Sequence, residues 1–355
     1  MKKGKKVLLL IISLMLLVMV VGCSQTEKPA DLEEPKESQS KKGEPEFTIR
    51  YSHCNSQGNL VYEAAEFFKK TIEEASNGRI AVQIYPAGQL ATGDDENMKN
   101  LTNGTIEMAP AAPLAMAKAS NMPQYNILDL PYVFSGVQEA RDFCNGEVFE
   151  KLDNEFREKT GLIPLVWYQT GTNAVGNTKR PITDPADMSG IKLRTANSDA
   201  ILNTVKIMGG NPVPIAFGET YTAVQQGVVD GLITPFVNFY AEKFYEITPY
   251  VSQWNSSVFF HCLFVNEDFY NSLPDDLKVI FDESVEKFDV FAIEEGDKFE
   301  FETVPQLLKD NGVELVQFTD EQIAKFQEAT KPVVEENIDV IGRDFYEAAM
   351  KELGR

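Results

Sequence analysis

The order of strands and helices near the start of the folded region restricts the fold more than any other feature of the chain. Residues 47–51 alternate apolar and polar side chains, as a strand does. Apolar residues at helical spacing follow over 60–75. Residues 79–85 alternate again, and a second helix is expected over about 94–101. A strand–helix–strand–helix order predicts an α/β unit with a largely parallel sheet.

The same order returns later in the chain and is followed by one long helix. Residues 162–168 are typical of a buried strand, 191–194 of a short strand and 198–208 of a helix. A helical pattern then extends from Pro274 to about Lys309. A helix of roughly 30 residues is about 45 Å long, which exceeds one small lobe. We therefore expect two α/β lobes braced by this helix.

The N-terminal segment indicates export. Four lysines precede an apolar run over 7–21 that is shorter than the ~20 residues a membrane span needs. This pattern is typical of a secretory signal peptide, here predicted over 1–22. The run ends in Gly22-Cys23, which resembles a bacterial lipobox, so Cys23 is predicted to carry a lipid anchor. An uncleaved anchor helix is the alternative. The polar segment that follows is predicted to be a flexible tether, 23–45.

Charge and motif content exclude several classes of function. The chain has 54 Asp plus Glu against 33 Lys plus Arg, and such a surface repels phosphate backbones, so no nucleic-acid partner is expected. Neither a nucleophile elbow nor a glycine-rich phosphate loop occurs. The two histidines, His53 and His261, have no metal-ligand spacing and are expected in a pocket or the core. No catalytic residue, metal or cofactor is therefore expected.

Residues 181–194, with the sequence PITDPADMSGIKLR, carry a family resemblance. This segment, together with GGNPVP at 209–214 and AVQQGVVDG at 223–231, resembles the DctP-type solute-binding subunits of TRAP (tripartite ATP-independent periplasmic) transporters, here in lipoprotein form. The resemblance implies a two-lobed, periplasmic-binding-protein-like fold with hinge-crossing strands and a long helix spanning both lobes. The expected boundaries are 46–171 plus about 260–299 for lobe I, and 172–259 plus about 300–355 for lobe II.

The resemblance also implies which residues hold a ligand. Arg194 matches the family's carboxylate anchor, and a guanidinium presents a planar fork of donors that fits a carboxylate. Asn173 stands where many members carry a second arginine, and Thr234 stands where many carry asparagine. Both departures reduce the polar groups near Arg194. The other candidate contacts are the two amides and the three aromatic side chains Asn197, Asn238, Phe217, Trp254 and Tyr168. Core packing is the alternative for the aromatic residues.

The resulting prediction is an extracytoplasmic binding protein rather than an enzyme. It would capture a small organic acid in the interlobe cleft, with an apolar or aromatic body favoured, and deliver it to the integral membrane subunits of a TRAP transporter. The lipid anchor would hold it at the outer face of the cell membrane or in the periplasm. One alternative is a sensor subunit that presents the ligand to a receptor kinase. The other is a secreted hydrolase, which needs a nucleophile with a base in reach, and the sequence shows no such pair.

Overall fold

The computed structural model describes residues 44–355. The expected signal peptide (1–22), the expected lipidation site Cys23 and all but the last two residues of the expected tether (23–45) lie outside the described residues. The strands are β1 (Phe47–Ser52), β2 (Ile80–Tyr85), β3 (Met108–Ala111), β4 (Leu162–Asn177), β5 (Lys192–Thr195), β6 (Asn211–Pro214), β7 (Gly231–Pro235), β8 (Tyr250–Gln253), β9 (Val258–Asn266) and β10 (Glu314–Gln317). The α-helices are α1 (Leu60–Ala75), α2 (Asp94–Thr102), α3 (Pro113–Ser120), α4 (Val137–Cys144), α5 (Glu147–Thr160), α6 (Asp199–Ile207), α7 (Thr220–Gln225), α8 (Asn238–Ala241), α9 (Glu267–Ser272), α10 (Asp275–Lys298), α11 (Val304–Asp310), α12 (Asp320–Ile341) and α13 (Arg343–Glu352).

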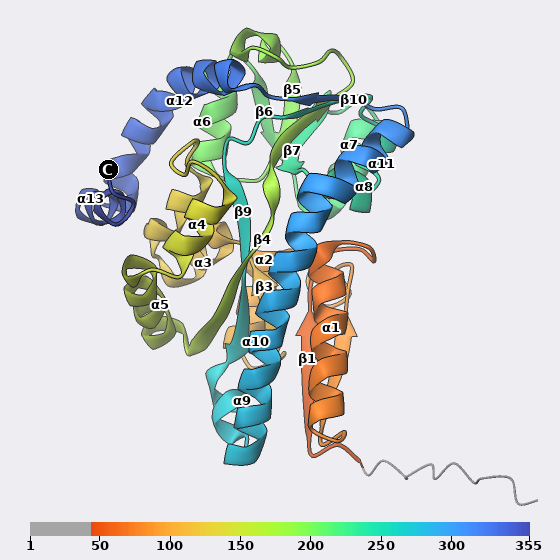
Figure 1. The fold of residues 1–355 in the computed structure, drawn as a ribbon, viewed down its shortest axis with the longest axis vertical. Helices are drawn as coiled ribbons and strands as arrows, with labels where there is room; N and C mark the ends of the chain where they lie inside the picture. Colours follow the sequence, from red (N-terminus) through yellow and green to blue (C-terminus); the bar gives the residue numbers. More distant parts are fainter. Residues whose placement is uncertain (1–43) are drawn as a thin grey trace, which may run out of the picture. The chain divides into compact units, whose positions relative to one another are not determined.

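The strands of residues 44–355 form a mixed sheet in two halves that share β4. The first half-sheet has the order β2-β1-β3-β9-β4, with β2, β1 and β3 parallel to one another. In the second half-sheet β4 lies between β8 and β7, and β5 and β6 follow β7 in parallel. Helices cover both halves (Figure 1). The predicted two-lobed α/β class is thereby confirmed.

Strand β4 is longer than the sequence predicts because it passes from one half-sheet to the other. The expected strand ended at Tyr168, where the apolar run over 162–168 gives way to polar residues. In the structure the pairing with β9 shifts register between Gln169 and Thr172, and Gly171 takes a φ of +115°. Beyond this bulge β4 continues between β7 and β8. The chain returns to the first half-sheet through residues 254–257, between β8 and β9.

The long helix predicted over 274–309 is confirmed. Helix α10 continues through the π-helical turn Phe299–Thr303 into α11, and the three segments run alongside both half-sheets (Figure 1). In the first lobe α10 packs on α1, where Phe68 meets Phe281 and Phe288 with ring centroids 5.9 and 6.4 Å apart. In the second lobe Val304 and Leu308 of α11 are fully buried in the apolar core. The helix therefore joins the two cores.

A buried carboxyl links this helix to β4 where both cross between the halves. Glu300 lies in the π-helical turn and is fully buried. Its Oε1 accepts hydrogen bonds from the Thr172 N–H at 3.2 Å, the Thr172 hydroxyl and Gln253 Nε2 at 2.8 Å. Its Oε2 has no partner within residues 44–355, and a Cβ on Gly171 would approach it to 2.9 Å. Burial raises the pKa of Glu300 to about 7, so this carboxyl takes up a proton near neutral pH.

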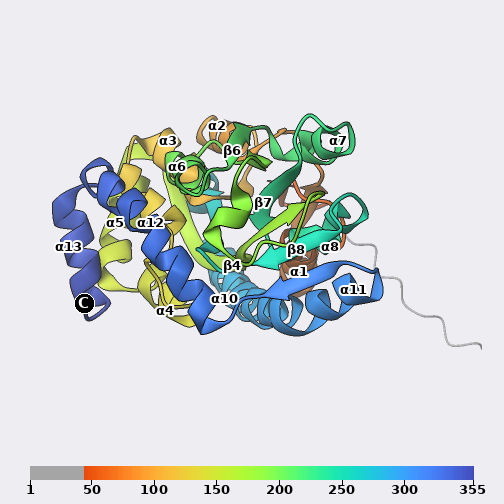
Figure 2. The same cartoon turned by 90° about the horizontal axis from the view of Figure 1, so that it is seen from above.

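The C-terminal helices run back from the second lobe to the first. Near its start α12 packs Phe326 against Trp254, with ring centroids 5.9 Å apart. At the other end Ile341 and Ala349 are buried in the same cluster as Phe149 of α5. Figures 1 and 2 show α13 beside α5 at one edge of the molecule. This end of the chain thus packs on the first lobe, whereas the expected boundaries place about 300–355 in the second.

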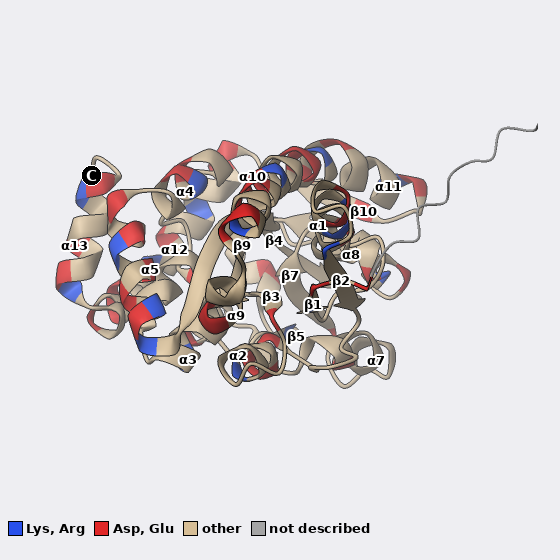
Figure 3. Ribbon diagram, turned by 90° about the horizontal axis from the view of Figure 1, so that it is seen from below, with Lys and Arg blue, Asp and Glu red and all other residues tan. Residues whose placement is uncertain are grey.

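Acidic and basic residues are scattered over the helices rather than gathered in one element (Figure 3). Asp and Glu outnumber Lys and Arg, giving a formal net charge of −21 for the whole chain. Most ion pairs of residues 44–355 lie on the surface, where each contributes little to stability. Within the described range, every helix is too short or too polar to cross a bilayer.

Candidate functional site

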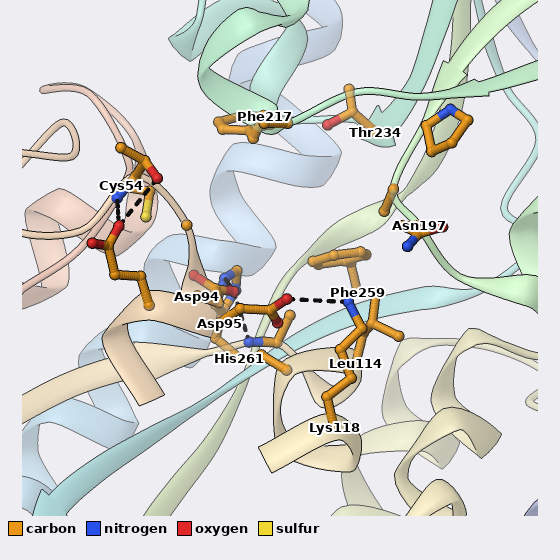
Figure 4. Close-up of a pocket in the computed structure, with 18 of the residues that line it drawn as sticks. Cys54, Asp94, Asp95, Leu114, Lys118, Asn197, Phe217, Thr234, Phe259 and His261 are labelled. Atoms are coloured by element: carbon orange, nitrogen blue, oxygen red, sulfur yellow. Dashed lines mark hydrogen bonds and ion pairs between the residues drawn. The ribbon is translucent and has the colours of Figure 1, made fainter. Parts of the chain in front are cut away.

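A cavity of about 980 Å³ lies between the two half-sheets. The first lobe contributes the start of α2, the start of α3, and Phe259 and His261 from β9. The second lobe contributes Arg194 from β5, the segment 214–217 and the end of β7. Figure 4 shows the two walls facing each other, with Asp94, Asp95 and His261 on one side and Phe217 and Thr234 on the other.

Among the charged residues that line the cavity within residues 44–355, Arg194 is the most buried. Its strand lies between β6 and β7 in parallel register, and its side chain is only 5% exposed. The Nε–H donates to the carbonyl oxygen of Ile215 at 2.9 Å, and the guanidinium carbon lies 5.7 Å from the centroid of the Phe217 ring. Burial lowers the pKa of Arg194 to about 10, so it stays cationic at neutral pH.

No carboxylate within residues 44–355 forms an ion pair with Arg194. Its only hydrogen bond there uses Nε, which leaves the two terminal amino groups without a protein acceptor. Burying an ion without an opposite charge costs several kcal/mol. An anion in the cavity would offset that cost, and the free edge of the guanidinium has the geometry that accepts a carboxylate through two parallel hydrogen bonds.

The structure brings six of the eight predicted contact residues to this cavity. They are Arg194, Asn173, Asn197, Phe217, Thr234 and Asn238. Asn173 is buried and donates to the Ser257 hydroxyl at 2.6 Å. Asn238 donates to the Thr234 hydroxyl at 3.0 Å and accepts from Asn59 Nδ2 at 2.8 Å. Asn197 is exposed at the cavity wall. The buried amides therefore already have partners, whereas Asn197 remains open to a ligand.

Tyr168 and Trp254 do not line the cavity. Tyr168 is fully buried on the face of β4 that packs on α10, with its ring 5.2 Å from that of Phe288. Trp254 is 1% exposed and packs against α12. Both were predicted to form the pocket wall. In the structure they pack in the core instead, Tyr168 against α10 and Trp254 against α12. Tyr168 is the cross-strand partner of the cavity-lining His261, with the two ring centroids 6.1 Å apart, so Tyr168 lies behind the cavity wall rather than in it.

The sequence placed His261 in a pocket or the core, as the cavity lining now shows, but it did not single out the acidic residues of the first-lobe wall. Asp94 begins α2, and its Oδ2 accepts from the Ala112 N–H at 2.9 Å and lies 3.8 Å from His261 Nε2. His261 Nδ1 lies 3.2 Å from the Thr170 hydroxyl. Burial lowers the pKa of His261 below its ordinary value despite Asp94, so the imidazole is neutral at pH 7. The acidic run at 94–96 was the available signal, but it also fits an ordinary helix start.

Among the hydrogen bonds of residues 44–355 that join the two lobes, three lie around the cavity. The Ser198 hydroxyl donates to Asp129 Oδ2 at 2.9 Å, and burial raises the pKa of Asp129 to about 6. The Ser56 N–H donates to Glu242 Oε1 at 3.2 Å. The bond from Asn59 to Asn238, described above, is the third. Each joins a loop or helix end of the first lobe to a helix end of the second lobe, so the lobes are held together here by polar contacts that can be exchanged for water.

Comparison with known proteins identifies the family. Residues 51–339 match the family of bacterial extracellular solute-binding proteins, family 7 (DctP). The C4-dicarboxylate-binding periplasmic protein DctP of Vibrio cholerae is 28% identical over 306 residues, covering 86% of this chain and 90% of that protein. The C4-dicarboxylate-binding protein DctB of Bacillus subtilis is 23% identical and covers 84% of each chain.

Solved structures show the same architecture. A TRAP periplasmic solute-binding protein from Sulfurospirillum deleyianum, with bound succinate, has a TM-score of 0.79 at 28% identity and covers 86% of this chain and 99% of its own. The sugar acid-binding protein DctPAm of Advenella mimigardefordensis, in complex with galactonate, has a TM-score of 0.82 at 24% identity and covers 88% and 98%. This chain therefore belongs to family 7 of the bacterial extracellular solute-binding proteins, the DctP family of TRAP transporter receptors.

Proposed function

We propose that this chain captures a small organic-acid carboxylate in the interlobe cavity and delivers it to the integral membrane subunits of a TRAP transporter. The observation that carries the proposal is the buried Arg194 guanidinium, which has no carboxylate partner within residues 44–355 and faces the cavity. A bidentate carboxylate supplies the missing acceptors and the opposite charge. Members of the family are solute-binding receptors and not enzymes.

The named relatives support an organic acid as the ligand class. Their printed ligands or names include C4-dicarboxylates, succinate and galactonate, which share a carboxylate and otherwise differ. In this chain Phe217 offers an apolar face beside Arg194, and Asn197 offers an uncommitted amide. Asn173, Thr234 and Asn238 are proposed to shape the wall through the hydrogen bonds they already make.

A thermal-shift screen of the purified protein against organic acids tests this function. A ligand that binds only the native state raises the melting temperature, and at about 100 times its Kd it adds about 2.7 kcal/mol of stability. We expect at least one small carboxylate to raise the melting temperature by several degrees, and its matching amide or alcohol to have no effect. If neutral analogues stabilise the protein as well as the acids do, the proposed role of Arg194 fails.

We also propose that Cys23 carries the lipid that holds the receptor at the outer face of the membrane. The support is the order of basic segment, apolar run and Gly22-Cys23 in the sequence. In a bacterial host fed a radiolabelled fatty acid, the chain is expected to take up label and to sediment with membranes. Cys23→Ser is expected to remove the label. A variant that stays labelled would contradict the proposed attachment site.

A further inference from the structure

The charged groups around the cavity are divided unequally between its two walls. Among the lining residues of the second lobe, Arg194 is the one ionisable side chain within the described part of the protein. The first-lobe lining holds four carboxylates and two lysines, which are Asp94, Asp95, Glu96, Asp129, Lys99 and Lys118. A ligand that bridges the walls therefore meets one cation at one end and mainly carboxylates at the other.

Both lysines of the first-lobe wall already lie beside acids. Lys118 Nζ is 3.2 Å from Asp95 Oδ2, and both side chains are about half exposed, at 43% and 55%. Lys99 is exposed and lies one helical turn after Glu96, whose pKa is lowered chiefly by hydrogen bonds from Thr92 and to a lesser degree by the charge of Lys99. Neither lysine is a buried, unpaired cation comparable to Arg194, so neither replaces a second arginine.

The interior of this wall is anionic or neutral. The Asp94 side chain is 25% exposed, and His261, 3.8 Å from it, is held neutral by burial. Asp129 is buried and bonded to Ser198, and its pKa is raised to about 6, so it is mostly ionised at neutral pH. Like charges brought together in a water-poor site repel, and the repulsion is much less screened than in bulk water.

We propose that the ligand is a monocarboxylate whose far end is uncharged, and that the first-lobe wall excludes a second carboxylate. This inference rests on the proposed function, in which Arg194 holds the first carboxylate. Asp94 and Asp95 then accept hydrogen bonds from hydroxyl or amide groups, or simply face an apolar end. The inference separates this chain from the relatives that are named for C4-dicarboxylates.

Matched pairs of acids test the inference by titration calorimetry on the full-length protein at neutral pH. The pairs are galactonate with galactarate, glycerate with tartronate, butanoate with succinate, and benzoate with terephthalate. The members of each pair differ in whether the far end carries a second carboxylate. For each pair that binds, we expect the Kd of the monocarboxylate to be at least about 100-fold lower than that of the dicarboxylate.

Charge-removing variants locate the cause of the discrimination. Asp94→Asn is expected to improve dicarboxylate binding by about tenfold, and so to reduce the ratio between the two affinities within each pair. The matched control, Glu321→Gln, removes one negative charge from the exposed surface of α12. It is expected to leave the affinities for both acids unchanged.

The outcomes separate this inference from the proposed function. A dicarboxylate that binds within about tenfold of its partner, or more tightly, overturns the exclusion but leaves the carboxylate receptor intact. Failure of every acid in all four pairs counts against the carboxylate function itself, and the inference falls with it. An unchanged ratio in Asp94→Asn, with the preference intact in the wild type, would also overturn the assignment of the effect to the first-lobe wall.

Discussion

Replacing Arg194 by Ala is expected to weaken binding of the captured acid by at least about 100-fold, or about 2.7 kcal/mol. Hydrogen bonds to charged groups contribute about 1.5–3 kcal/mol each, and this guanidinium offers two that the described protein does not use. Since the cavity holds no comparable buried cation within residues 44–355, no other side chain takes over the charge. Isothermal titration of the acid found in the thermal-shift screen measures the loss.

The unliganded stability of the variant separates a binding role from a structural one. A buried guanidinium without an opposite charge costs free energy, so Arg194→Ala is expected to melt at the same temperature as the wild type or higher. Arg194→Lys keeps the charge but loses the planar fork, and intermediate affinity is expected. Arg343→Ala, which removes an exposed arginine of α13, is the control and should bind normally. Unchanged affinity in Arg194→Ala would rule out the proposed anchor.

Replacing Glu300 by Gln is expected to change how stability depends on pH. Burial raises the folded-state pKa of Glu300 to about 7, whereas the unfolded chain titrates near its ordinary value of 4.5. The contribution of Glu300 to stability is therefore fully present below pH 4.5 and is lost as the pH rises through 7. Gln cannot ionise. Between about pH 5 and about pH 9 the variant should gain about 2–3 kcal/mol in unfolding free energy relative to the wild type.

Denaturant unfolding at a series of pH values measures this difference. At low pH the variant is expected to be no more stable than the wild type, since the protonated Glu300 keeps its three bonds from Thr172 and Gln253. Asp297, one turn earlier, is paired with Arg141 at 2.9 Å and remains in both proteins. Glu302→Gln is the matched control, because Glu302 is exposed in the same turn. Parallel pH profiles for wild type and Glu300→Gln would refute the assignment.

The order of elements could be predicted from the sequence because it depends on local signals, whereas Arg194 was singled out by the family resemblance of residues 181–194. The spacing of apolar residues predicted the main strands and helices, including the long helix that comprises α10 and α11. The meeting of Asp94 and His261 in the first-lobe wall could not be found in this way. Asp94 and His261 are far apart in the chain, and they meet only because β3, which follows α2, pairs antiparallel with β9.

The errors in the predicted site have a similar physical origin. Tyr168 ends the strand expected over 162–168 and Trp254 follows β8, and an aromatic residue at such a position fits a pocket wall and a core equally well in a sequence. Their side chains face α10 and α12, and the position of those helices is a property of the whole fold. Strand β4 was predicted too short because Gly171 and its polar neighbours mark a loop in a sequence, whereas here they form a bulge inside a strand.

The irregularities at the lobe crossings are the places where we expect the molecule to bend. Strand β4 has its bulge at Gly171, the long helix has its π-helical turn at 299–303, and α12 contains Pro332, which cannot donate the usual backbone hydrogen bond. All three connections depart locally from regular geometry while their flanks stay regular. We therefore expect the lobes to rotate as rigid bodies about these points. The cavity can then open and release its ligand without any change in the packing of either core.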